Sequence, residues 1–112
     1  MKTKKSKAEI KFQIELDENN VPDSIRWLAT DGKDSFTDAK AVIMSIWDGD
    51  NKNSLSIDLW TKDMMAEEMQ HFTFQILDSL SKSYKRSVGD EKVAKYIQDC
   101  AIKIGKELNI LK

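Results

Sequence analysis

The residues able to do chemistry in this sequence are few, and they do not form a catalytic pattern. His71 is the single histidine, and on a helical wheel it points away from the apolar stripe of its helix. A lone exposed histidine is far more often a surface residue than a general base or a metal ligand. Glu67 and Glu68 are adjacent, so their carboxylates point to different sides of the helix and are poorly placed to share acid–base work. We therefore predict that the protein is not an enzyme and has no catalytic residues.

Patterns for metal and phosphate binding are also incomplete. Asp48, Asp50 and Asn53 begin like a calcium-binding loop, but the pattern breaks at Lys52 and Asn53 and lacks the distal glutamate. No glycine-rich phosphate loop or nucleophile elbow is present. Cys100 is the only cysteine, which excludes an intrachain disulfide, and its place on the apolar face of the last helix predicts a buried thiol. The sequence predicts no cofactor and no metal.

Length and composition indicate one small folded domain. The chain has 112 residues, of which 40% are hydrophobic and 33% charged, and a chain of this size builds a single core. A formal net charge of −1 provides no global field to attract nucleic acid. The lysine-rich residues 1–7 predict a flexible basic tail, followed by one α+β domain over residues 8–112. Without a signal peptide or a stretch of ~18 apolar residues, we expect no membrane span and a cytoplasmic protein.

Two-residue alternation predicts the strands that must position any functional surface. Residues 8–17 and 24–30 alternate in this way, and the turn at 18–23 joins them into an antiparallel hairpin. A short helical turn is expected through residues 37–39. Residues 41–47 are apolar on both faces and also fit a helical stripe. We favour a strand there, because β-branched residues are frequent and the turn at 48–53 connects it directly to a strand over 55–60.

Three- and four-residue spacing predicts two long helices in the second half of the chain. Asp63 is expected to cap a helix that runs to about residue 87, Gly89 to end it, and Asp90 to cap a second helix. Strands followed by helices indicate an α+β fold. We predict one four-stranded antiparallel sheet, in the order β-β-β-β-α-α, with the two C-terminal helices packed on one face.

Apolar side chains on the other face of that sheet are candidates for binding a second molecule. Tryptophan and methionine are enriched at interfaces, although extra core packing is the alternative for each residue. If residues 55–60 alternate regularly, Trp60 lies on that other face. Either Ile43 and Trp47 or Val42 and Met44 then lie beside it. The predicted protein-interaction residues are Leu28, Ile43, Trp47, Trp60, Met64 and Phe74. A chaperone-like or small-ligand-binding module that uses the same face is the alternative function.

Several ungapped blocks follow one another along the chain: 14–22 (IELDENNVP), Trp27 with 29–32 (ATDG), 39–41 (AKA), 45–48 (SIWD), 57–64 (IDLWTKDM) and 89–92 (GDEK). Together they resemble the gliding-motility protein GldC family of Bacteroidetes-type bacteria, from about Ala8 to the end of the chain. The family often has proline after the Asp–Met step, where this chain has Met65 and Ala66. The resemblance implies a small accessory protein of gliding motility, associated with the surface-adhesin and secretion machinery, with no established catalysis. Its expected partner is a protein of that machinery or a second copy of itself, not nucleic acid.

Overall fold

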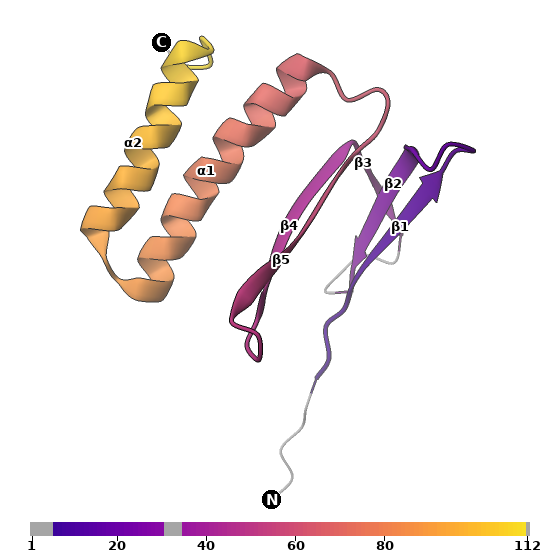
Figure 1. Cartoon of the computed structure of the whole chain (residues 1–112), viewed down its shortest axis with the longest axis horizontal. Helices are drawn as coiled ribbons and strands as arrows, with labels where there is room; N and C mark the ends of the chain where they lie inside the picture. Colours follow the sequence, from indigo (N-terminus) through magenta and orange to yellow (C-terminus); the bar gives the residue numbers. More distant parts are fainter. Residues whose placement is uncertain (1–5, 31–34, 112) are drawn as a thin grey trace, which may run out of the picture. The chain divides into compact units, whose positions relative to one another are not determined.

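The computed structural model describes residues 6–30 and 35–111, so part of the predicted basic tail lies outside the described residues. The chain divides into two compact units, residues 1–64 and 65–112, and each is described by itself. The first unit holds the strands and the second holds two helices, which confirms the α+β class (Figure 1). The elements are β1 (Ile10–Leu16), β2 (Pro22–Ala29), β3 (Thr37–Ala39), β4 (Ala41–Asp48), β5 (Asn53–Trp60), α1 (Ala66–Val88) and α2 (Glu91–Glu107).

β1 and β2 form the predicted antiparallel hairpin. Phe12 lies opposite Trp27 and Ile14 lies opposite Ile25, so the apolar residues of both strands share one face. Ile25 is the most deeply buried large side chain, at 1% exposure. The turn is closed by the Asp17 carboxylate, which accepts hydrogen bonds from the backbone N–H groups two and four residues later. The two-residue alternation in the sequence therefore determines which face of this hairpin is apolar.

The prediction of one four-stranded sheet is wrong, because the strands form two sheets. The first contains β1, β2 and β3 in that order, and the second contains β4 and β5. The segment expected to form a helical turn is instead β3, which pairs with β2 through Ile25 opposite Ala39. The chain bends at Lys40, between β3 and β4, and changes its pairing partner from β2 to β5. The prediction that the helices pack on one face stays a prediction.

The β4–β5 hairpin shows that residues 41–47 are a strand, not a helix. Its register runs from Ala41 opposite Trp60 to Asp48 opposite Asn53 without interruption. One face carries apolar side chains along most of its length: Val42, Met44, Ile46, Leu55, Ile57 and Leu59. The other face therefore carries Ile43 and Trp47, the first of the two alternatives left open by the sequence, together with Trp60.

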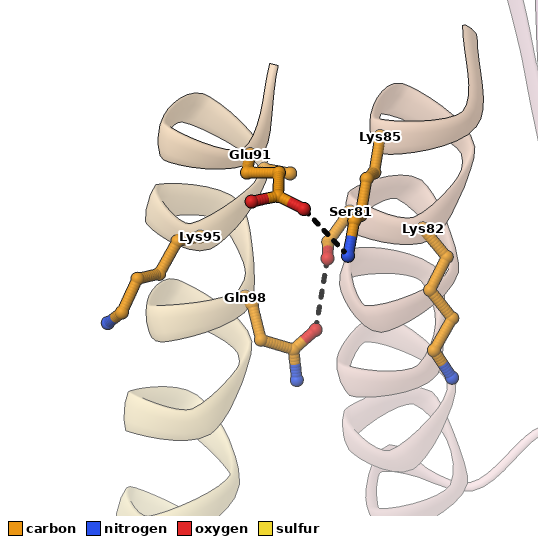
Figure 2. A pocket seen from close by; sticks show the side chains of 7 residues that line it. Ser81, Lys82, Lys85, Glu91, Lys95 and Gln98 are labelled. Carbon is orange, nitrogen blue, oxygen red and sulfur yellow. Dashed lines mark hydrogen bonds and ion pairs between the residues drawn. The ribbon is translucent and has the colours of Figure 1, made fainter. Parts of the chain in front are cut away.

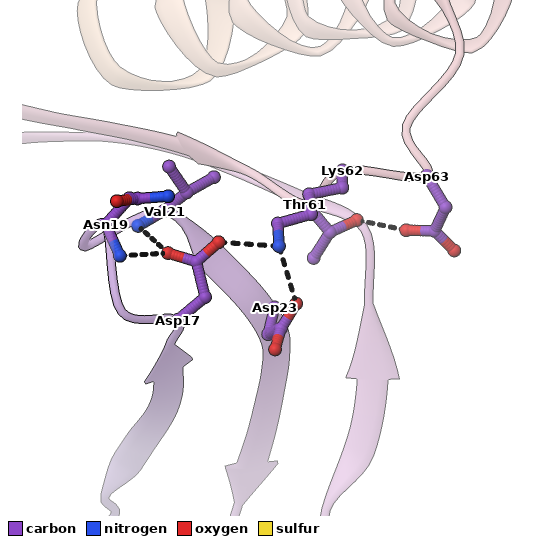
Figure 3. A network of polar contacts seen from close by, with 7 residues as sticks. All are labelled: Asp17, Asn19, Val21, Asp23, Thr61, Lys62 and Asp63. Carbon is purple, nitrogen blue, oxygen red and sulfur yellow. Dashed lines mark hydrogen bonds and ion pairs between the residues drawn. The ribbon is translucent and has the colours of Figure 1, made fainter.

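A polar network holds the turn between β1 and β2 against the segment that follows β5 (Figure 3). The Lys62 ammonium forms ion pairs with Asp17 and, at 3.4 Å, with Asp23. The Asp17 side chain is only 15% exposed, and its hydrogen bond to Lys62 is the main reason that the pKa of its carboxyl falls from 3.8 to about 2. The same bond raises the pKa of Lys62 above 10.5. The network therefore favours the charged form of both groups.

Helix α1 begins later than predicted, at Ala66. Asp63 does not cap it, because its carboxylate accepts a hydrogen bond from the Thr61 hydroxyl instead. The first turn is held by the Glu68 carboxylate, which accepts from the Met65 backbone N–H at 3.0 Å. The helix ends as predicted at Gly89, whose φ of 79° is left-handed. Asp90 caps α2 as predicted, accepting from the two N–H groups at the start of that helix.

Small residues on α2 allow the two helices of the hairpin to approach closely. Ala94, Ala101 and Gly105 are buried on one side of α2, and the Ser81 hydroxyl of α1 bonds to the Gln98 amide oxygen at 3.0 Å (Figure 2). Cys100 is exposed, so the prediction of a buried thiol is wrong. The physical reason is that the small-residue side of α2, not the stripe of larger apolar residues, is its buried side.

We predict that Gly105→Ala destabilises the helical hairpin. A Cβ at Gly105 would lie 2.8 Å from Leu111 Cδ1 and 2.9 Å from a ring carbon of Phe74. Overpacking of this kind costs about 1–3 kcal/mol, which exceeds the ~1 kcal/mol that alanine gains from helix propensity. Thermal unfolding followed by circular dichroism should show a lower Tm. Gly49→Ala is the matched control, since nothing lies within 4 Å of that position, and equal Tm values for both variants would contradict the packing described here.

Asp17→Asn should destabilise the protein at neutral pH and reduce its sensitivity to acid. The folded-state pKa of Asp17 is depressed, so its contribution is present above its ordinary value of 3.8 and is lost as the pH falls through about 2. The amide keeps an acceptor for the turn but removes the charge that pairs with Lys62. Tm values measured between pH 7 and pH 2 should therefore converge for the wild type and the variant at the acid end. Glu18→Gln, in the same turn, removes an equal charge that has no ion-pair partner within the described chain, and it should leave the acid profile unchanged.

Candidate interaction site

The candidate surface is the side of the β4–β5 hairpin that carries Ile43, Trp47 and Trp60, called here the tryptophan face. These side chains are 46%, 67% and 52% exposed, respectively. Trp47 lies next to the β4–β5 turn and Trp60 lies at the opposite end of β5. Six ladder positions separate them, roughly 20 Å along the strands. The structure therefore places the two tryptophans on one face but at its two ends, with Ile43 close to Trp60.

The middle of the tryptophan face is polar. Ser45 lies opposite Ser56, and their hydroxyl oxygens are 3.3 Å apart. Ser54 and Asp58 occupy the same face on β5. A partner that covers the whole face must therefore offer apolar groups at two ends and hydrogen-bonding groups between them.

A shallow groove lies beside Trp60. It measures about 220 Å³ and is lined mainly by apolar surface from the β1–β2 turn and from the end of β5, with Val21 and Pro22 on one side and Leu59 and Trp60 on the other. Lys62, two residues after Trp60, pairs with acids on both sides of that turn. The polar network thus holds the groove in shape. The sequence analysis did not predict this groove. The only sequence feature that indicates it is the charged segment directly after Trp60, which contains Lys62.

The other predicted interaction residues do not join the tryptophan face. Leu28 pairs with Lys11 in the other sheet, on the face opposite Trp27. Met64 is half-buried in the turn after Thr61. Phe74 is half-buried in α1 and lies against Gly105, so it belongs to the packing of the helical hairpin.

A polar depression of about 500 Å³ lies where the two sheets meet. Its lining includes Ser24, Arg26, Lys40, Thr61 and Asp63. The Thr61 hydroxyl donates to Asp63, and this bond is the main cause of the lowered pKa of that carboxyl. The buried Ser24 hydroxyl has no hydrogen-bond partner among the described residues, so none of the carboxylates that line the depression is bonded to it. The depression therefore lacks a nucleophile–base pair.

The acidic turn that began like a calcium loop is closed by its own hydrogen bonds. Asp48 accepts from the Asn51 side-chain amide at 2.8 Å and from the Asp50 backbone N–H at 3.0 Å. The first of these bonds is the main reason that the pKa of the Asp48 carboxyl is lowered. Over the residues that the structure describes, no three metal-binding side chains gather in a possible metal site. His71 is exposed, as predicted.

The helical hairpin carries a second groove, lined by three lysines (Figure 2). Each of the three already has an acidic partner: Lys85 pairs with Glu91 across the hairpin at 3.5 Å, and the other two pair with acids four residues away on their own helices. This groove therefore offers little uncompensated charge to an anion. In the described part of the chain, neither helix is long and apolar enough to cross a membrane.

Comparison with known proteins gives one clear match. Residues 22–110 match the family described as gliding motility-associated protein GldC-like. No curated protein and no solved structure matches the chain. The matched region begins at Pro22, so the likeness of residues 8–21 stays a prediction, while the resemblance seen over β2 to α2 is confirmed. The match spans well over half of the sequence, and the chain therefore belongs to the GldC-like family of gliding motility-associated proteins.

Proposed function

We propose that this protein is a non-enzymatic binding module of gliding motility, which engages a protein of the motility or secretion machinery in the cytoplasm. Membership of the GldC-like family supports the link to motility. The side-chain chemistry supports binding over catalysis, because the exposed histidine, the partnerless Ser24 and the closed Asp48 turn do not converge on one site. The module acts through its apolar surface.

The observation that carries this proposal is that both faces of the β4–β5 hairpin carry large apolar side chains. One face has six aliphatic or methionine side chains, and the other has the two tryptophans and Ile43. Trp47 is 67% exposed and Trp60 is 52% exposed, so both rings are accessible to another molecule. Tryptophan is the residue type that most often dominates binding energy at interfaces.

The groove beside Trp60 indicates how a partner engages this face. Its apolar lining, to which Trp60 contributes, and its small size suit one inserted apolar side chain. The Ser45–Ser56 pair in the middle of the face suits a hydrogen-bonding backbone or side chain. The partner proposed here is thus a folded protein surface or segment that presents an apolar anchor to Trp60.

The breadth of the exposed apolar surface favours one second candidate, a chaperone-like binder of unfolded segments. Large apolar side chains are exposed in both sheets, including Ile10 at 69%, Trp47 at 67% and Leu55 at 54%. Such a binder takes many unrelated apolar peptides with similar affinity, whereas a dedicated module takes one partner. Titration with an unfolded polypeptide and with a hydrophobic dye separates the two functions.

Trp60→Asp should weaken the capture of the native partner from extracts of the source cells without unfolding the protein. A buried charge at an interface centre removes the anchor and leaves a carboxylate unpaired, so we expect at least a tenfold loss of captured partner. Circular dichroism checks that the fold is retained. Tyr96→Asp, at a 60% exposed aromatic residue on α2, is the matched control and should capture the partner normally.

Two results would contradict this proposal. If Trp60→Asp unfolds the protein, Trp60 is a core residue and not part of a binding surface. If the folded variant captures the partner as well as the wild type does, the binding surface lies elsewhere. A parallel Trp47→Asp variant shows whether the partner reaches the far end of the tryptophan face.

A further inference from the structure

Within residues 6–30 and 35–111, no strand pairs with the outer edge of β1. In the sheet order β1-β2-β3, the first strand has β2 on one side only. Two backbone hydrogen bonds flank the strand: the Thr30 N–H donates to the Glu9 carbonyl, and the Asp17 N–H donates to the Val21 carbonyl. They show that the odd-numbered residues of β1 bond toward β2. Backbone groups alternate in direction along an antiparallel ladder. The N–H and C=O groups of the even-numbered residues from Ile10 to Leu16 therefore point outward.

This edge lacks the features that usually protect an exposed strand. β1 contains no proline and is seven residues long. The one register shift in the hairpin adds Asp23 to β2, so β1 itself stays regular. Lys11 is the only cation on the strand, and it lies 3.8 Å from Glu9. Edges of this kind readily accept another strand.

The sequence of β1 is complementary to itself when two copies run antiparallel. In the register centred on Gln13, all seven residues find a partner, and Lys11 of one copy lies opposite Glu15 of the other, twice by symmetry. Phe12 then lies opposite Ile14, and Ile10 opposite Leu16, on the same apolar face. The outward-pointing even-numbered residues are the ones that become hydrogen-bonded pairs. Charge, apolar pattern and backbone direction agree in this single register.

We propose that two copies of this chain associate through β1, paired antiparallel about Gln13, to join two three-stranded sheets into one. The contact is isologous, as a two-fold dimer requires. It covers part of the apolar surface at the ends of the strand, where Ile10 is 69% and Leu16 is 53% exposed. The association is independent of the partner proposed above, because that partner binds the tryptophan face of the other sheet.

Neighbouring registers and the other strands fit less well. Shifting the register by two residues in one direction places Glu9 opposite Glu15. Shifting it by two residues in the other direction places Gln13 opposite Glu15 and leaves Ile10 without a partner in the strand. β4 and β5 each have eight residues, so complete self-overlap would set an odd-numbered residue opposite an even-numbered one. Apolar side chains would then meet the opposite face of the other copy. β3, with three residues, is too short.

Charge reversal tests this pairing directly in the purified full chain. Lys11→Glu and Glu15→Lys each set like charges opposite one another at two symmetry-related positions. We expect each to raise the dimer dissociation constant about tenfold at low ionic strength, measured by analytical ultracentrifugation. The charge reversals should have little effect on the β1–β2 pairing within one chain. The residues opposite Lys11 and Glu15 on β2 are Leu28 and Ser24, which are uncharged.

Recovery of the dimer is the decisive control. The double variant Lys11→Glu/Glu15→Lys should dimerise like the wild type, and an equimolar mixture of the two single variants should form mixed dimers. Ile14→Pro, which removes an outward N–H that the β1–β2 ladder does not use, should abolish the dimer while circular dichroism stays unchanged. A wild-type chain that remains monomeric at high concentration overturns the proposal. So does a dimer that Lys11→Glu, Glu15→Lys and Ile14→Pro all leave unchanged, whereas the Trp60→Asp capture result bears only on the proposed function.

Discussion

The backbone carbonyl of Lys40 accepts a hydrogen bond from the Thr61 N–H at 2.8 Å, and the Thr61 hydroxyl oxygen lies 3.3 Å from the same carbonyl oxygen. This contact ties the bend between β3 and β4 to the end of β5, and Thr61 is 4% exposed there. One residue later, Lys62 pairs with the two acids that flank the β1–β2 turn. The arrangement of the two sheets depends on these adjacent residues, because they join the elements on either side of the bend.

The bend has consequences for what the surface is able to do. If the segment from Thr37 to Asp48 ran straight, it would be one long strand shared by β2 and β5, and a single sheet would follow. The change of partner at Lys40 instead gives two small sheets with exposed edges, and both faces of the β4–β5 hairpin carry large apolar side chains. An open strand edge on one sheet and exposed tryptophans on the other follow from that geometry.

Much of the fold was predictable because local pattern and final structure agree. Alternation in β1, β2 and β5 predicted these strands and their faces, and β-branched residues with the following turn predicted β4. Gly89 and Asp90 predicted the break between the helices. The bend was not predictable, since three residues such as Thr37–Ala39 carry no periodic signal and their pairing is set by β2, far away in sequence. The prediction that Asp63 caps α1 was wrong because its carboxylate accepts a hydrogen bond from the Thr61 hydroxyl, and the helix begins after Met65.

The candidate site was predicted in part. Trp47 and Trp60 share a face because the β4–β5 register places them there, which is one of the two alternatives that the sequence left open. Phe74 did not join them, because Gly105 makes room for its ring between the helices, a feature that no hydrophobic pattern reveals. The groove beside Trp60 was missed because it forms only when Lys62 brings a distant turn to the end of β5.

The central claim is that the protein acts by binding through the tryptophan face. Hydrogen–deuterium exchange on the chain with and without its captured partner tests it most directly, since it reports which backbone segments the partner covers. We expect added protection in peptides that span β4 and β5, with little change in α1 and α2. Protection confined to the two helices would contradict the account.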